Sequence, residues 1–291
     1  GRPINKVGPP IVLFHDDFGQ FINDFANQNL DIQYDVFSIA QKLMATASQF
    51  FNNEDDRNEA MTVELGNLFS EPLIPITYGS GKDKKSGDGV LITTNEAQIC
   101  YRFEGKKELC ASNAEPTLQA SLYYHGYWSQ IKSKKIRDQC CCPSYMLVIA
   151  GPWICLLGGI YIDKIIIEPL TDFISLIPKP GDDSHVRRIA RFLVALNMAM
   201  TRLNHYYQNM ELNAFDSPND QRYFPYSSTY QDRNNNQINF RYIHPLTEDI
   251  QKPIWKAIAN NRPIVIKFAR RYSAEAHNIC AELRLAPNLL Y

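Results

Sequence analysis

Charged side chains crowd the end of one short alternating segment, "YRFEGKKELC" at residues 101–110. The alternation of its first half predicts a β-strand, and residues two apart in a strand share a face, so Glu104 and Lys106 point the same way. A carboxylate that can hold a cation beside an ammonium that can orient a water suits metal-assisted attack on a phosphate. A charged strand edge that discourages aggregation would explain the same two residues without any chemistry.

A second carboxylate comes just before this strand in the chain. The segment 89–106 reads as a β-hairpin that turns near Asn95, and its first strand begins directly after Asp88. The hairpin would bring Asp88 beside Glu104, and two carboxylates with a backbone carbonyl form a hard oxygen site suited to Mg²⁺. Taken alone, an Asp-Gly pair is more typical of a turn.

Two further polar residues lie on one face of a predicted helix at residues 115–135, which has Pro116 in its first turn. Gln119 and Tyr123 are four residues apart and therefore neighbours on the helix surface. Singly, they would be a surface polar residue and a core aromatic residue. Their position after Asp88 and Glu104 gives them a functional interpretation as well.

In this order, Asp88, the E-x-K at 104–106 and the Q-x-x-x-Y at 119–123 resemble the PD-(D/E)XK nuclease superfamily, in the variant with a Gln/Tyr helix typical of RecB-like nucleases. The phrases "EPTLQASLYY" and "AGPWICLLGGIYIDKIIIEPLTDF" are similar to the nuclease-type module of fungal and oomycete Crinkler-type effectors. Related fungal proteins fuse this module to a kinase-like domain. The resemblance covers about residues 55–210. It departs from the superfamily pattern at Gly87, where proline often precedes the aspartate.

The resemblance implies an α/β fold with a restriction-endonuclease-like core, a mixed central sheet flanked by helices. The implied active-site residues are Asp88, Glu104, Lys106, Gln119 and Tyr123. Asp88, Glu104 and the Gly105 carbonyl would bind Mg²⁺ or Mn²⁺, and Lys106 would assist the attacking water. Gln119 and Tyr123 would support the site or contact the substrate.

Many members of the superfamily add an acid from the helix before the hairpin, and Glu59 and Glu64 are both candidates here. The implied activity is a Mg²⁺-dependent DNA endonuclease acting inside cells, in the nucleus, and in a host nucleus if the protein is an effector. The alternative is a catalytically inactive nuclease-like scaffold that binds DNA or protein and is attached to a kinase-like domain. A homo-oligomer is a further candidate assembly.

Composition is that of an ordinary globular protein, with 291 residues, 45% hydrophobic and 21% charged residues. The net charge of −1 gives no global basic field, so any nucleic-acid surface would have to be local. Seven cysteines without framework spacing favour reduced thiols. The most apolar window, residues 145–170, is interrupted by Pro152 and Asp163 and predicts short buried strands rather than a membrane span.

The N-terminus "GRPINKVGPP" has neither an initiator Met nor a hydrophobic signal core, so we expect the chain to be a piece of a longer polypeptide. The order of predicted elements divides it into four parts. These are an N-terminal helical region (1–54), the nuclease-like domain (55–210), a linker or long loop (211–240) and a C-terminal segment (241–291).

The C-terminal segment resembles the start of a protein-kinase N-lobe. Lys267 in "VIK" would correspond to the strand lysine, and Glu275 on the next predicted helix to its ion-pair partner. Neither a Gly-rich loop before Lys267 nor the later kinase motifs accompany it, so this segment alone cannot perform kinase chemistry. Alternatively, a basic strand and a helix pack on the main domain.

Overall fold

The computed structural model describes residues 8–66, 68, 74–78, 85–93, 97–105, 115–212, 217–232, 234–247, 253–269 and 271–290. Of residues 54, 74–78, 85–91 and 98–105 it describes the backbone. The chain divides into two compact units, one formed by Pro10–Tyr223 and the other containing Phe224–Tyr291. The C-terminal strand and helix therefore belong to a unit of their own and not to the main one.

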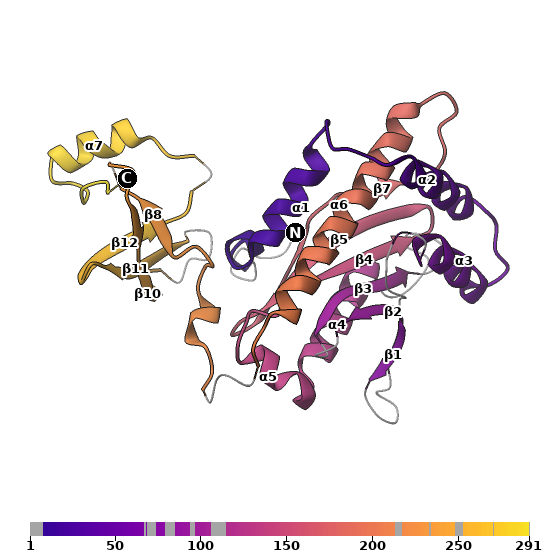
Figure 1. Cartoon of the computed structure of the whole chain (residues 1–291), viewed down its shortest axis with the longest axis horizontal. Helices are drawn as coiled ribbons and strands as arrows, with labels where there is room; N and C mark the ends of the chain where they lie inside the picture. The colour runs from indigo at the N-terminus through magenta and orange to yellow at the C-terminus, as the bar shows by residue number, and fades with distance from the viewer. Residues whose placement is uncertain are drawn as a thin grey trace. The chain divides into compact units, whose positions relative to one another are not determined.

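The main unit alternates helices with strands (Figure 1). Its helices are α1 (Asp16–Ala26), α2 (Tyr34–Ala47), α3 (Glu54–Gly66), α4 (Pro116–Trp128), α5 (Lys134–Arg137) and α6 (Asp183–Gln208), with short 3₁₀ turns η2 (Ile11–Leu13), η4 (Ile131–Ser133) and η5 (Asp220–Tyr223). Its strands are β1 (Ile74–Tyr78), β2 (Lys85–Ile92), β3 (Gln98–Gly105), β4 (Ser144–Ala150), β5 (Trp153–Tyr161), β6 (Ile165–Pro169) and β7 (Ile174–Ser175). The chain is thus a mixed α/β protein.

All seven strands form one sheet in the order β1-β2-β3-β4-β5-β6, with β7 paired to β5. Every neighbouring pair is antiparallel except β3 and β4, which are parallel. Helix α4 connects these two strands, as a parallel pair requires. The strands predicted in residues 145–170 and the hairpin predicted at 89–106 are both confirmed.

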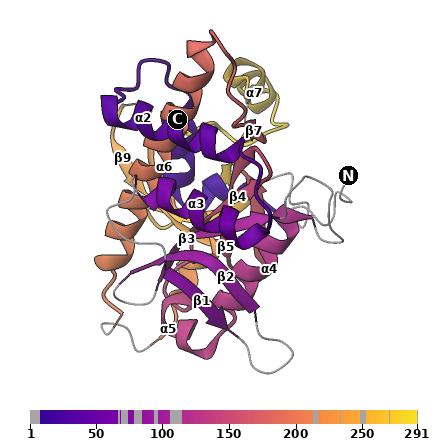
Figure 2. The same ribbon diagram turned by 90° about the vertical axis from the view of Figure 1, so that its right-hand side faces the viewer.

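Two adjacent glycines in β5 mark how closely the helices approach the sheet. A Cβ on Gly158 would lie 2.5 Å from Ile11 and 2.8 Å from Phe18, so this face is covered by η2 and α1. A Cβ on Gly159 would lie 2.9 Å from Met146 and 3.2 Å from Tyr124, so the other face is covered by α4. Helices α1 and α2 pack against the long helix α6, as the two views show (Figures 1 and 2).

A buried polar network joins α1, β4 and α6. The Asp17 carboxylate accepts hydrogen bonds from Tyr145, at 2.9 Å, and from the Arg202 guanidinium. Arg202 also pairs with Asp24 at 3.0 Å. Burial raises the pKa of the Asp17 carboxyl, and the bonds from Arg202 and Tyr145 offset part of that rise. Asp17 can reach both Tyr145 and Arg202 only when α1 lies in one position along the sheet. These hydrogen bonds therefore fix the position of α1.

The second unit is a small all-antiparallel assembly followed by one helix. It contains β8 (Thr229–Gln231), β9 (Gln237–Asn239), β10 (Arg241–Pro245), β11 (Ile254–Ala259), β12 (Arg262–Lys267) and α7 (Ala274–Glu282). β8 pairs with β9, and β10-β11-β12 form a three-stranded sheet. The segment 211–240, predicted as a linker or long loop, contains η5 and the β8–β9 hairpin.

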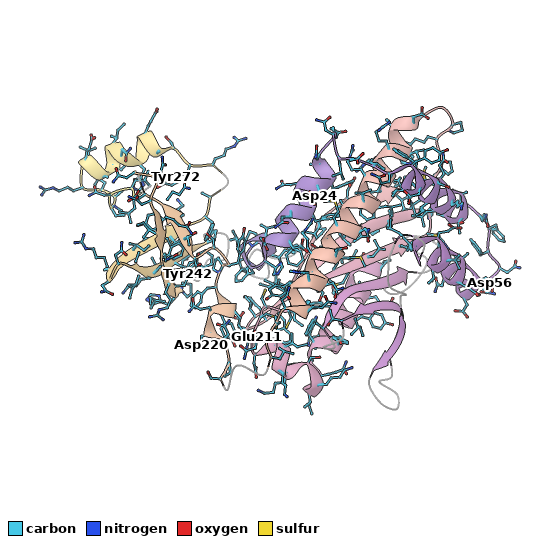
Figure 3. The ribbon with its side chains drawn as sticks, in the orientation of Figure 1. Asp24, Asp56, Glu211, Asp220, Tyr242 and Tyr272 are labelled. Carbon is cyan, nitrogen blue, oxygen red and sulfur yellow. The ribbon has the colours of Figure 1, made fainter. Side chains whose placement is uncertain are left out.

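Aromatic rings form the core of this second unit. Tyr242 on β10, labelled in Figure 3, stacks on Phe224 with ring centroids 5.4 Å apart. It meets Trp255 edge-on at 6.0 Å. Trp255 in turn contacts Phe268 at 5.7 Å. Within the part of the chain that the structure describes, no helix is long and apolar enough to cross a membrane.

The glycine at position 158 should be intolerant of any side chain. Gly158→Ala should lower the free energy of unfolding by about 1–3 kcal/mol, because Ile11 and Phe18 must move to admit the methyl group. Gly19→Ala is the matched control, since a Cβ there meets nothing within 4 Å and removing a helical glycine should add about 0.5–1 kcal/mol. Urea denaturation measures both, and equal effects would contradict the close packing of α1 on β5.

The His15 side chain should make stability fall with acidification. The side chain is 8% exposed, and its Nδ1 accepts a hydrogen bond from the backbone N–H of Asp17 at 3.4 Å. Burial lowers its pKa from 6.5 to about 4, although the nearby Asp16 carboxylate acts in the opposite direction. Between these values the unfolded chain binds a proton that the folded chain does not. Acidification across that window should therefore cost up to about 3 kcal/mol of stability from this residue.

The matched variant is His15→Asn, which keeps an oxygen for the helix cap but does not titrate. Denaturation of both proteins at a series of pH values should give a shallower pH dependence for the variant between about pH 6.5 and 4. Superimposable curves would show that His15 is already protonated in the folded protein.

Candidate functional site

Helix α4 carries Gln119 and Tyr123 and is held in place at both ends. At its start, Pro116 occupies the first turn. The Glu115 carboxylate caps the helix by accepting hydrogen bonds from the backbone N–H groups of Thr117, at 3.2 Å, and Leu118, at 2.8 Å. At its end, the Trp128 indole donates to Ser144 at 3.1 Å. The helix end therefore lies at the start of β4.

The direction of α4 decides which end of the sheet its polar residues approach. β4 starts where α4 ends, and α4 packs on both β3 and β4. The first half of α4 must therefore lie towards the ends of β3 and β4. Gln119 and Tyr123 are both half-buried there, and Tyr123 packs against the core.

The strands place the proposed carboxylates on adjacent backbones. Gly89 of β2 lies opposite Arg102 of β3, so Asp88 precedes one partner and Glu104 follows the other by two residues. In the parallel pair, Glu104 lies beside Ile149 and Gly105 beside Ala150.

The backbone of β2 is irregular at Asp88 itself. The register against β1 runs from Ile74 opposite Val90 to Ile76 opposite Gly87. Between these two pairs β1 has one residue and β2 has two, Asp88 and Gly89, so β2 contains one extra residue here. This is a β-bulge, which bends a strand and changes where its side chains point.

The two candidates for an additional acid, both on helix α3, differ in their burial. Glu59 is exposed, whereas Glu64 is half-buried and its Oε2 is buried without a hydrogen-bond partner among the described residues. A buried carboxylate oxygen without a partner is costly, and a bound ion is one arrangement that compensates for this cost. Of the two, Glu64 is the better candidate.

Sequence reasoning missed Arg57 on the same helix. Arg57 is 6% exposed, and its guanidinium donates to the carbonyl of Gly151, in the turn that follows Ala150 at the end of β4. Arg57 and Glu64 are seven residues apart and so share the face of α3 that also buries Met61. That spacing is the sequence signal that could have found it.

The remaining predicted residues are described only in part or not at all. Lys106 is not among the described residues, and the side chains of Asp88 and Glu104 are not described either. Among the described side chains, no three of His, Cys, Asp or Glu gather as a metal site would require.

The Cys155 thiol can be set aside as a reacting group. Burial, reinforced by the charges of Glu115 and Asp172, raises the pKa of the Cys155 thiol to about 12. Cys155 is therefore protonated at neutral pH and is a poor nucleophile.

The basic run that follows α4 is engaged locally. Lys132 lies over the Tyr127 ring, 5.3 Å from its centroid, and Lys134 pairs with Asp138 at 2.5 Å. Both lie past the end of α4 that meets β4, away from Gln119. They do not form a phosphate-binding wall beside the candidate site.

In the second unit, Lys267 ends β12 and Glu275 lies in the first turn of α7. Both are exposed, and no ion pair joins them in the described structure. Instead, the Lys267 ammonium lies 5.2 Å from the centroid of the Tyr272 ring. Tyr272 and His277 are hydrogen-bonded to each other, which links this loop to α7.

No protein-family model matches the chain, and no curated protein and no solved structure is significantly similar to it. The candidate site is therefore defined by this chain's own residues and strand pairing.

Proposed function

We propose that the main unit is a Mg²⁺-dependent endonuclease that hydrolyses DNA. The observation that carries the proposal is the order and pairing of the elements around Asp88 and Glu104. Helix α3 is followed by three antiparallel strands, then by α4, then by β4 parallel to β3. This arrangement supports a restriction-endonuclease-like core, with the E-x-K triplet at the end of the third strand.

The bulge in β2 is what the proposed pair of carboxylates requires. Because Gly89 lies opposite Arg102, an unbroken ladder would put residues 88 and 104 on opposite faces of the sheet. One inserted residue reverses that alternation locally. The register shift beside Asp88 thus supports a site in which Asp88 and Glu104 face the same side.

The donor set suits a hard divalent cation. Asp88, Glu104 and the Gly105 carbonyl would offer oxygen ligands, and the buried Oε2 of Glu64 is a further acceptor that lacks a partner among the described residues. A bound Mg²⁺ would stabilise the negative charge on the phosphate oxygens and lower the pKa of a bound water molecule. Lys106 would orient that water, and Gln119 would hold the substrate backbone from α4.

DNA is the proposed substrate because oxygen ligands for a divalent cation, with a lysine next to them in the sequence, suit phosphodiester hydrolysis. The net charge of −1 means that binding would depend on local contacts with the phosphates. Such contacts position the backbone without reading the bases, so we expect cleavage with little sequence preference.

Substitution of the two E-x-K side chains tests the activity. Glu104→Gln and Lys106→Ala should each reduce nicking of supercoiled plasmid in Mg²⁺ by about 100-fold or more, since each removes a charge that acts on the transition state. Asp55→Asn, an exposed acid on α3, is the control and should cleave like the unaltered protein. Undiminished cleavage by both variants would overturn the proposed site.

Metal binding is tested separately by calorimetry with Mn²⁺. Asp88→Asn should abolish binding, and Glu64→Gln should weaken it by about tenfold, because each removes an anionic oxygen ligand. Glu59→Gln should leave the affinity unchanged, since Glu59 is exposed. Metal binding without cleavage of DNA or RNA would favour the inactive scaffold instead.

A further inference from the structure

The second unit presents an open sheet edge along β12. The strand order β10-β11-β12 makes Arg262–Lys267 the outermost strand, and no described strand pairs with its outer edge. Four of its six residues are exposed, and Val265 is 52% exposed. An edge strand with free backbone groups can pair with another strand.

The turn before β12 decides which backbone groups point outward. Asn260 and Asn261 both have positive φ, of 48° and 60°, which defines a two-residue hairpin turn. The flanking pair, Ala259 and Arg262, is then hydrogen-bonded, and bonded and non-bonded pairs alternate along the ladder. Phe268 donates inward to Pro253 at 3.0 Å, in agreement with this alternation.

Counting along the strand from this turn, Ile264 and Ile266 bond to β11, whereas Pro263, Val265 and Lys267 turn their backbone groups to the open edge. The edge offers three carbonyls and the N–H groups of Val265 and Lys267. Pro263 has no N–H, but at this position an N–H would point away from β11, so no hydrogen bond between β11 and β12 is lost.

The two faces of β12 have different chemistry. Lys256 lies opposite Val265, and Lys267 shares their face, so this face carries two ammonium groups. The other face presents Ile264 and Ile266, both half-buried. All six residues of β12 line a pocket of about 1310 Å³, and no carboxylate is among the described residues that line it.

We propose that β12 binds an extended peptide with alternating acidic and apolar side chains, which adds to the sheet as a fourth strand. Its backbone would pair with Val265 and Lys267, its apolar side chains would lie beside Ile264 and Ile266, and its acidic ones beside Lys256 and Lys267. A row of donors and acceptors spread along a strand matches an extended chain. A phosphate group would instead need N–H donors that converge on one point. This surface is independent of the proposed nuclease site.

The experiment measures fluorescence anisotropy of a labelled seven-residue peptide that alternates Glu and Val, added to the full chain. The peptide should bind saturably, and a peptide that alternates Lys and Val should bind more weakly. Val265→Pro should weaken binding by about tenfold, because it removes an outward N–H without breaking the β11 ladder. Val265→Ala keeps that N–H and should bind within about threefold of the unaltered protein. Circular dichroism of each variant should match that of the unaltered protein, which shows that the chain remains folded.

Charge is tested by Lys256→Glu, which should weaken binding of the Glu peptide and strengthen binding of the Lys peptide. Equal affinities of Val265→Pro and Val265→Ala would overturn strand addition. Displacement of the peptide by ATP at similar affinity would overturn the choice of a peptide over a phosphate ligand.

Discussion

The parallel pairing of β3 with β4 is the constraint on which the main unit depends. Two parallel neighbours cannot be joined by a tight turn, so the chain must cross back over the sheet, and α4 is that crossing. The helix is fixed where it meets β4, by the bond from Trp128 to Ser144 and by the bond from Tyr124 to the Cys142 carbonyl at 2.8 Å. Its opposite end is thereby directed to the end of β3, where the E-x-K triplet lies.

The layer on the other face is held by polar contacts where apolar packing alone would leave α1 free to slide. Burying Asp17 costs free energy, and the bonds from Arg202 and Tyr145 compensate for that cost only in one arrangement of α1, β4 and α6. Gly158 adds a steric constraint at the same face, since Ile11 and Phe18 occupy the space of a side chain. Specific polar pairing and close packing together set the position of α1.

Local sequence patterns predicted the elements well, because each pattern is short. The apolar run of β4, the hairpin of β2 and β3 and the cap of α4 are all encoded within a few residues. The bulge at Asp88 was not predicted, since it depends on how β1 pairs with β2 across a loop. The burial of Arg57 could have been suspected from its spacing to Glu64, but its partner Gly151 could not be predicted, because it lies 94 residues away.

The boundary at Tyr223 was also beyond local reasoning. The segment 211–240 is polar and rich in Asn and Asp, which is typical of a linker, yet the β8–β9 hairpin forms there. The aromatic rings of Phe224 and Phe240 pack on Tyr242, so a part of the segment belongs to the core of the second unit. The aromatic residues scattered through this polar segment indicate a packed structure, which its overall polar composition does not.

Helix α3 buries charged groups on its inner face, which costs stability. Arg57 and Glu64 turn towards the interior on the face that also buries Met61 and Leu65, positions where apolar residues would cost less. The Gly151 carbonyl compensates for part of the burial of Arg57. One oxygen of Glu64 has no such compensation within the described residues. A chain that keeps two charged groups on a buried helix face gives up stability there, and a role in the proposed cation site would account for that loss.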